Sequence, residues 1–211
     1  MPRQPASPGP ATPELIAQAA LQLIDEEGPH SLSFRSLADR LGVSHMTIHR
    51  RCGDLDGLLD LCVDHLAGQL PDIEPGVDWA QATEARFGSF YELLAAHRGL
   101  AALRGARPWL GPQILARLVE PALRDNLAVG MSPHEAIRAY RRMYLLTLGC
   151  STFVDHQDPR AATAATRTAL AGLDPEQFPT LTGNMEDVLS AMTDHEVYYG
   201  ALRQLIAAAH P

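Results

Sequence analysis

Hydrogen-bonding side chains crowd one short segment around residue 48. Arg50 and Arg51 carry rigid forks of N–H donors, which match the O6 and N7 acceptors of guanine or the oxygens of a phosphate. Ile48 alone is an obvious apolar anchor for the opposite side of the segment. The segment therefore has the chemistry to contact nucleic-acid bases rather than to fill a core. Its candidate contacts are Ser44, His45, Met46, Thr47, His49, Arg50 and Arg51.

Two short helices joined by a tight turn should position this segment. Ser33 can cap the first helix, whose apolar stripe comprises residues 37, 38 and 41. Gly42 can adopt the left-handed conformation that ends a helix, and Ser44 can cap the second helix. This is the layout of a helix-turn-helix, whose second helix enters the DNA major groove. Ser33 and Arg35 are then expected to hold phosphate, although helical proteins that never bind DNA can share the layout.

The charge of the chain argues against nonspecific DNA binding. The chain has 211 residues, a net charge of −8 and 17 basic residues, all of them arginine. Residues 1–70 carry five arginines against nine acidic residues, a net charge of −4. A nonspecific binder is expected to be basic, because phosphate neutralisation supplies most of its affinity. A specific binder remains possible, because three arginines lie in or beside the predicted reading segment.

Composition also bounds the compartment and the cofactors. The Pro-rich start, residues 1–11, lacks the apolar stretch of a signal peptide and is predicted to be a disordered arm. No apolar run approaches the roughly 18 residues that span a membrane. The three cysteines match no metal-ligand spacing and are expected to be reduced thiols in a cytoplasmic protein. No cofactor or metal is expected.

Helix-start signals recur along the chain and predict an all-α fold. Caps at Thr12, Asp54 and Asp78, and a Ser132–Glu135 capping box, each precede an apolar pattern. Similar signals at Asp174 and Thr193 predict two further helices, and no segment alternates like a strand. Two prolines and a glycine within 71–76 mark a boundary. The predicted domains are a helix-turn-helix domain, 12–70, and a helical domain, 71–211.

The last helix and the uncharged segment 143–150 have more apolar surface than one core needs. One stripe of the last helix can face the core of its own protomer, and the surplus can face a second subunit. An ordinary tightly packed core is the alternative. The predicted dimer-interface residues are Val197, Tyr198, Ala201, Leu202, Leu205 and Ile206.

Residues 41–54 read Leu-Gly-Val-Ser-His-Met-Thr-Ile-His-Arg-Arg-Cys-Gly-Asp. With three preceding helix signals and a fourth helix starting at Asp54, this pattern resembles the TetR family of one-component repressors over residues 13–68. The likeness implies a homodimer on a pseudopalindromic operator, with its two recognition helices roughly 34–36 Å apart. The chain departs from the family at three positions. His49 stands where tyrosine is frequent, Cys52 where a large apolar residue is usual, and Leu55 where lysine is usual.

The resemblance also implies a small-molecule effector bound between helices of the second domain. Such a pocket would be apolar with a few polar groups, and each residue proposed for it could equally be ordinary core. Tetracycline-binding members of the family hold magnesium with a histidine and an acid, but the corresponding region here offers Arg104 and Phe153, so another effector is expected. The candidate residues are Phe87, Phe90, Tyr91, Leu94, His97, Arg104, Trp109, Leu115, Tyr140, Tyr144, Thr147 and Phe153.

Two other classes of function compete with a DNA-binding regulator. An enzyme is disfavoured, because the chain has no nucleophile elbow and no Gly-rich phosphate loop. The run 155–158 (Asp-His-Gln-Asp) suggests a metal site, but adjacent residues do not share a helix face. The remaining alternative is a helical interaction protein with a degenerate helix-turn-helix that does not bind DNA.

Overall fold

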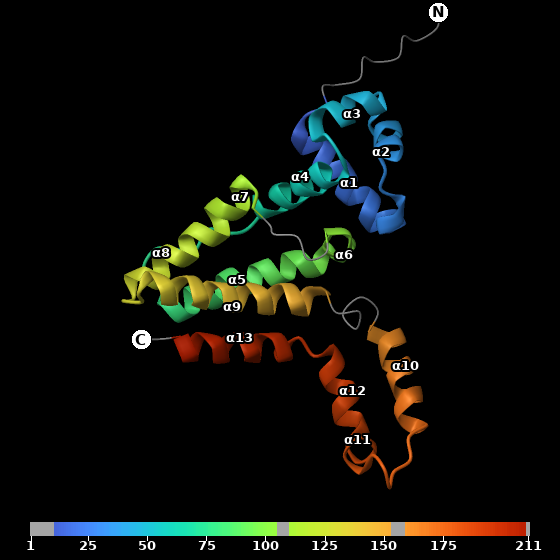
Figure 1. The fold of residues 1–211 in the computed structure, drawn as a ribbon, viewed down its shortest axis with the longest axis vertical. Helices are drawn as coiled ribbons and strands as arrows, with labels where there is room; N and C mark the ends of the chain where they lie inside the picture. The colour runs from blue at the N-terminus through green and yellow to red at the C-terminus, as the bar shows by residue number, and fades with distance from the viewer. Residues whose placement is uncertain (1–10, 105–109, 153–158, 210–211) are drawn as a thin grey trace, which may run out of the picture. The chain divides into compact units, whose positions relative to one another are not determined.

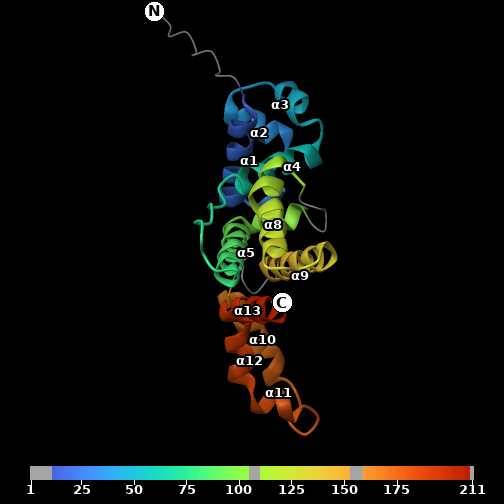
Figure 2. The ribbon, with the colours of Figure 1, turned by 90° about the vertical axis from the view of Figure 1, so that its left-hand side faces the viewer.

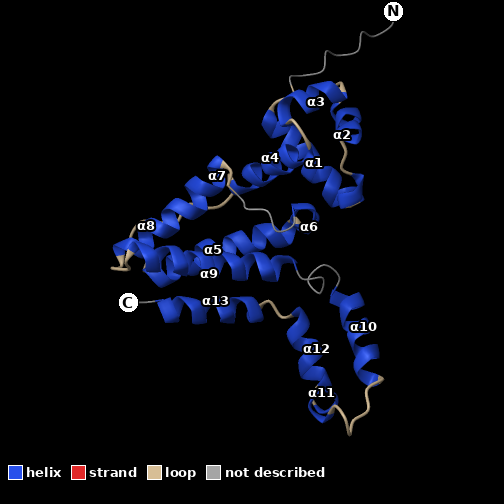
Figure 3. Ribbon diagram, viewed as in Figure 1, coloured by secondary structure: helices blue, strands red, loops and turns tan. Residues whose placement is uncertain are grey.

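The computed structural model describes residues 11–104, 110–152 and 159–209, and all regular structure in these ranges is helical (Figure 3). The all-α prediction is therefore confirmed. The predicted arm falls outside the described residues except for Ala11, which is only 7% exposed and so belongs to the folded part. Within the described ranges, no helix has the length and apolar character needed to cross a membrane.

The described residues form helices of 3 to 20 residues, separated by turns and short connections (Figure 1). The helices up to residue 104 are α1 (Pro13–Glu27), η1 (Pro29–Ser31), α2 (Phe34–Leu41), α3 (His45–Cys52), α4 (Leu55–Ala67), α5 (Trp79–Ala96) and α6 (Arg98–Arg104). Those after residue 110 are α7 (Pro112–Ile114), η2 (Leu115–Val119), α8 (Glu120–Ala128), α9 (Pro133–Thr152), α10 (Pro159–Ala171), α11 (Pro179–Gly183), α12 (Met185–Thr193) and α13 (Glu196–Ala209).

The chain divides into two compact units, and neither is continuous in sequence. Unit 1 comprises residues 1–72 and 96–122, and unit 2 comprises residues 73–95 and 123–211. The boundary expected near residue 71 coincides with the end of the first segment of unit 1. Residues 96–122, which the sequence analysis placed in the second domain, group with unit 1 because α6 and α7 pack on α1 and α4.

Unit 1 is built around α1. Its buried face includes Ile16, Ala20 and Leu23, and it packs against α2, α4 and α6. The predicted cap at Thr12 is present, since its hydroxyl accepts a hydrogen bond from the N–H of Leu15 at 3.3 Å. Helix α4 also contacts α3 and α7, so it connects the helix-turn-helix to the second segment of the unit.

Unit 2 contains a packed core and a helical hairpin. Helix α9 packs along α13, and residues of α5 bond to α13 through the buried hydroxyl of Tyr198, which donates to the carbonyl of Phe87 at 2.9 Å. Helices α10 and α12 run beside each other (Figure 2). A paired contact joins them, because both terminal nitrogens of Arg167 donate to the carboxylate of Glu186, at 2.5 and 3.0 Å.

Several predicted boundaries were wrong. The sequence analysis missed α6 and α10 and did not foresee η2, which is a widened π-helical turn. This turn lies just before Pro121, which has no N–H to donate and whose ring crowds the carbonyl four residues earlier. Asp174 does not start a helix, because its carboxylate accepts from the N–H of Glu176 within a turn.

Candidate functional site

Helix α3 is held in place by local capping at both of its junctions. The hydroxyl of Ser33 accepts from the N–H of Ser36 at 3.1 Å and so caps α2. Gly42 ends α2 with φ of +66°, a left-handed conformation that costs glycine little. The hydroxyl of Ser44 then accepts from the N–H of Thr47 at 3.2 Å and caps α3. All three predicted capping roles are confirmed, and they set the angle between the two helices.

The surface of α3 is almost entirely polar and exposed. Ile48 is completely buried and anchors the helix, as predicted, whereas Met46 is 54% exposed. His45, His49, Arg50 and Arg51 are exposed, and Thr47 is half-buried. Among the described residues, neither Arg50 nor Arg51 forms an ion pair. Their guanidinium groups are therefore available to a ligand.

His49 packs against the other helix of the pair. Its ring meets the ring of Phe34 edge to face, with centroids 5.7 Å apart. Phe34 begins α2, so this contact ties the C-terminal half of α3 to the start of α2. The ring at residue 49 thus has a packing role although the residue as a whole is exposed.

The acidic residues of unit 1 are largely engaged by partners away from α3. On α1, Asp25 accepts from His97 at 3.0 Å and Glu26 pairs with Arg40. On α4, Asp60 pairs with Arg104 and Asp64 accepts from the N–H of Gln113 at 2.6 Å. Asp54 caps α4 through the N–H of Gly57 at 2.8 Å. Two acids of residues 1–70, Glu26 and Asp60, are therefore paired with arginines within unit 1.

The junction of α3 and α4 tolerates no side chain at Gly57. A Cβ at this position would lie 2.0 Å from the carbonyl oxygen of Cys52, which is backbone and cannot rotate away. Burial raises the pKa of the Cys52 thiol. The sequence analysis did not identify this contact, because the pattern of residue types does not reveal how closely two helices approach.

The residues predicted to bind an effector fall into two groups. Trp109 and Phe153 lie outside the described residues. His97, Arg104 and Leu115 belong to unit 1, where the first two pair with Asp25 and Asp60 and Leu115 is 41% exposed. The other seven belong to unit 2 and come from two helices, α5 with Phe87, Phe90, Tyr91 and Leu94, and α9 with Tyr140, Tyr144 and Thr147.

These seven residues form an aromatic cluster in the interior of unit 2. The rings of Phe90 and Tyr144 are stacked, with their centroids 6.0 Å apart. The hydroxyl oxygen of Thr147 lies 2.9 Å from the hydroxyl oxygen of Tyr198. Burial raises the pKa of Tyr198 well above its ordinary value. Tyr198 was predicted at a dimer interface, but it stacks on Tyr91 with centroids 3.9 Å apart and is 1% exposed. That part of the interface prediction is wrong, because the side chain is used inside the protomer.

The other predicted interface residues divide along α13 in the same way. Leu202 and Ile206 are buried within the protomer, at 0% and 5% exposure. Val197 is 54% exposed, and Ala201 and Leu205 are half-buried. Helix α9 carries exposed Ile137 and Leu145, at 56% and 52%. Unit 2 thus has apolar side chains that its own core does not cover.

Sequence reasoning missed a buried arginine beside the aromatic cluster. Arg86 of α5 is 6% exposed, and its Nη2 donates to Asp125 of α8 at 2.7 Å. Its Nη1 is buried with no hydrogen-bond partner among the described residues. The signal that could have revealed it is a charged residue on an apolar stripe, between Thr83 and Phe90 at helical spacing.

Comparisons with known proteins agree with this geometry. Residues 16–61 match the family model "Bacterial regulatory proteins, tetR family", and residues 70–207 match "Tetracyclin repressor-like, C-terminal domain". An HTH-type transcriptional regulator of Saccharopolyspora erythraea is 32% identical over 183 residues, which are 82% of this chain and 74% of the relative.

The fold is similar to that of ActR from Streptomyces coelicolor. Apo ActR aligns with a TM-score of 0.80 and 25% identity over 96% of each chain. ActR in complex with actinorhodin aligns with a TM-score of 0.75 and 26% identity, over 95% of this chain and 96% of ActR.

Proposed function

This chain belongs to the TetR family of bacterial regulatory proteins, and from that membership we propose that it is a ligand-responsive repressor that binds a pseudopalindromic operator as a homodimer. Members of this family are transcriptional regulators, not enzymes. The observation that carries the proposal is α3, a capped helix with one buried anchor and two arginines free of ion pairs. Such a regulator would act at the nucleoid.

The recognition helix would read DNA with its exposed residues. Arg50 and Arg51 would bind guanine or phosphate, Met46 and Thr47 would contact thymine methyl groups, and His45 would read a base edge. Ser33, Arg35, Ser44 and His49 would contact phosphate, where a helix N-terminus adds its own N–H groups. Because Ser33 and Ser44 already cap helices, their contribution would come mainly from the N–H groups around them.

The homodimer would use the apolar side chains that unit 2 leaves exposed. Val197, Ala201 and Leu205 recur every fourth residue on one side of α13, and Ile137 and Leu145 lie on α9, which packs along it. Two copies pairing through the same patch would give a twofold axis. A twofold protein matches a pseudopalindromic DNA site.

The effector would be a small amphipathic molecule with an acceptor oxygen. The aromatic cluster of α5 and α9 offers ring surface, and the unsatisfied Nη1 of Arg86 is a buried donor that such an oxygen would satisfy. ActR, a structural relative, binds actinorhodin. The effector would release DNA to the extent that it binds the DNA-free conformation more tightly than the DNA-bound one.

A gel-shift assay tests the proposal. The full chain is titrated onto DNA from immediately upstream of its own gene and of a divergent neighbour, with the R50A/R51A variant in parallel and R160A as a control. Arg160 is an exposed arginine of α10, so its loss removes one charge without touching α3. We expect a salt-sensitive shift for the native chain and R160A, and at least a hundredfold weaker binding for R50A/R51A.

The same assay distinguishes a DNA-binding regulator from the alternative, a helical interaction protein that does not bind DNA. A footprint over a pseudopalindrome would establish a dimeric DNA-binding regulator. If a genome-wide selection of DNA sites also yielded no bound sequence, the degenerate helical interaction protein would replace this proposal.

A further inference from the structure

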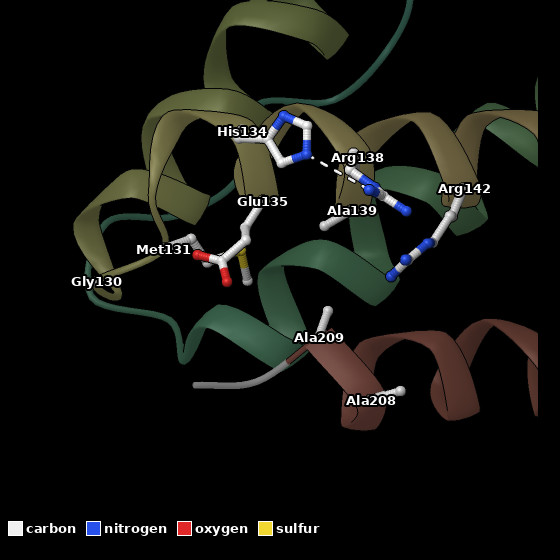
Figure 4. Close-up of a pocket in the computed structure, with 9 residues that line it drawn as sticks. All are labelled: Gly130, Met131, His134, Glu135, Arg138, Ala139, Arg142, Ala208 and Ala209. Atoms are coloured by element: carbon white, nitrogen blue, oxygen red, sulfur yellow. Dashed lines mark hydrogen bonds between the residues drawn. The ribbon is translucent and has the colours of Figure 1, made fainter.

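A cavity of about 460 Å³ opens between the first half of α9 and the end of α13, entirely within unit 2 (Figure 4). None of the residues predicted to bind the effector lines it. Its wall is polar on the α9 side and apolar beneath. The residues around it are Gly130, Met131, His134, Glu135, Arg138, Ala139, Arg142, Ala208 and Ala209.

Three nitrogen-bearing side chains border this cavity from one face of α9. His134, Arg138 and Arg142 are spaced four residues apart, so they lie on successive turns about 6 Å apart along the helix. Figure 4 shows their heads on the side of α9 that borders the cavity, with Arg142 extending into the space between α9 and α13. A single helix therefore supplies a row of donors for one ligand.

The histidine and the central arginine are coupled to each other. Nη1 of Arg138 lies 3.4 Å from Nε2 of His134. A guanidinium nitrogen can only donate, so Nε2 accepts and the ring proton resides on Nδ1. Nδ1 of His134 then remains as a donor for a ligand. The contact also restricts the guanidinium group of Arg138, which retains four other N–H bonds for a ligand.

The charge balance of the cavity favours a single negative charge. Glu135 is the one carboxylate among the lining residues, and it is committed to capping α9, accepting from the N–H and hydroxyl of Ser132 at 3.0 and 2.6 Å. These hydrogen bonds lower the pKa of Glu135, so it stays ionised. Two arginines against one glutamate leave a net charge of +1. The carbonyl end of α13 adds only a partial negative charge.

The cavity also has an apolar floor. Met131 and Ala139 are 7% and 3% exposed, and Ala208 and Ala209 close the other side with methyl groups. The volume lies within the range of about 300–1,000 Å³ that is usual for small-molecule sites. A ligand that fits both surfaces has an apolar body and one acidic group.

We propose that this cavity is a second small-molecule site, which binds a monoanionic organic acid with its carboxylate on Arg138 and Arg142 and its apolar body against Met131. The carboxylate accepts from the two guanidinium groups, and the Nδ1–H of His134 can donate to a further oxygen. This site is distinct from the effector site in the aromatic cluster. It does not depend on DNA binding.

Titration with sodium salicylate tests the site on the full chain without DNA. The chain is labelled with ¹³C at its methionine methyl groups, so that Met131 reports the cavity and the exposed Met46 of α3 reports nonspecific binding. Calorimetry compares the native chain with R138Q/R142Q and with the control R141Q. Arg141 is the next residue on α9 but does not line the cavity, and its guanidinium lies over the ring of Tyr144.

We expect salicylate to shift the Met131 signal and not the Met46 signal. The R138Q/R142Q variant should weaken binding at least about tenfold, and R141Q less than twofold. Salicylamide, which keeps the ring and the hydroxyl group but lacks the carboxylate charge, should bind at least about tenfold more weakly than salicylate. All three arginines are exposed, so both variants should match the native chain in circular dichroism.

Other results would overturn the inference. An unmoved Met131 signal at saturating salicylate would mean that the acid binds elsewhere, including the effector site. Equal weakening by R141Q would indicate diffuse attraction by positive charge. If R138Q/R142Q instead turned a dimer into monomers and salicylate did not bind, the cavity would accept a carboxylate of a second copy. The first two of these outcomes would leave the proposed operator binding untouched.

Discussion

The arginines of unit 1 differ in whether an acidic side chain pairs with them. Arg40 and Arg104 are paired with acids of α1 and α4, whereas the arginines of α3 have no such partner among the described residues. The same type of residue is therefore held in an ion pair at one position and available for the proposed DNA contacts at another. Net charge alone cannot distinguish the two uses, because it counts both kinds equally.

Replacing Arg50 and replacing Arg35 should change DNA binding in different ways. We expect Arg50→Ala to cost about 1–3 kcal/mol of operator affinity and to relax base preference at one operator position. Arg35→Ala, at the start of α2, should weaken binding to all sequences alike and reduce the salt slope by about one. A panel of operator point mutants, titrated at several salt concentrations, separates these patterns. A uniform loss for Arg50→Ala would place that residue on phosphate.

Cys62 should make the fold sensitive to alkali. Burial raises the pKa of its thiol to about 12, so the folded state keeps a proton that the unfolded chain releases near pH 9. A group with a raised folded pKa stabilises fully below its unfolded pKa, and that contribution is lost as the pH rises toward 12. Between pH 9 and 10.5 we expect a loss of about 1–2 kcal/mol in the free energy of unfolding.

Urea unfolding from pH 8 to 10.5 measures this loss. Cys62→Ala should be less stable at pH 8, because it leaves a cavity, but its stability should fall less steeply above pH 9. The raised pKa values of the buried tyrosines contribute equally to both proteins. Cys150→Ala, at a half-buried position, is the comparison. Parallel slopes for the native chain and Cys62→Ala would contradict the assignment.

At the scale of helices, the junction of α3 and α4 depends on close backbone approach. Gly57→Ala would place a methyl group on the carbonyl of Cys52, so one of the two helices must shift. We expect a loss of about 2 kcal/mol or more in the free energy of unfolding, together with weaker operator binding as α3 moves. Gly183→Ala is the matched control, since nothing lies within 4 Å of its added Cβ. Urea unfolding that is identical for both variants would mean that the junction relaxes freely.

Helix starts were predictable from the sequence because capping is local. Thr12, Ser33, Ser44, Asp54 and Ser132 each bond within three residues of the chain. Helix α10 was missed because its Ala- and Thr-rich sequence gives no strong apolar stripe. Helix α6 was missed because its seven residues follow almost directly after α5, with no capping residue type at His97. The local sequence pattern thus predicted that segments are helical better than it predicted where each helix begins and ends.

The exposure of the candidate site residues was predictable only where one helix carries them. The face of α3 follows from spacing, so its exposed and buried residues were assigned correctly. The residues predicted to bind the effector fall in both units. One reason is that His97 bonds to Asp25, 72 residues away, and sequence spacing cannot reveal such a partner. Tyr198 was misassigned for the same reason, since its contacts on α5 and α9 lie far off in the chain.

At the scale of the whole molecule, the proposed dimer should control DNA affinity. We expect V197E/L205E to sediment as a monomer at micromolar concentration, because two buried carboxylates per subunit would lose hydration without gaining a partner. Operator affinity should fall at least about a hundredfold, since each half-site would then bind alone.

Leu181→Glu provides the control for added charge. Leu181 is 40% exposed on α11, away from α13 in sequence, and its replacement should leave both sedimentation and operator affinity unchanged. If the V197E/L205E protein remained dimeric, the dimer interface would not include the exposed apolar side chains of α13.

The discontinuity of the two units matters for anyone who builds chimeric sensors. A cut at residue 72, which linear boundaries suggest, would leave α1 and α4 without the α6 and α7 segment that packs on them. Asp25, Asp60 and Asp64 would lose His97, Arg104 and the N–H of Gln113 together. A chimera of two relatives should therefore take residues 96–122 from the same parent as residues 1–72. The two units of this chain are thus interleaved segments rather than consecutive halves of the sequence.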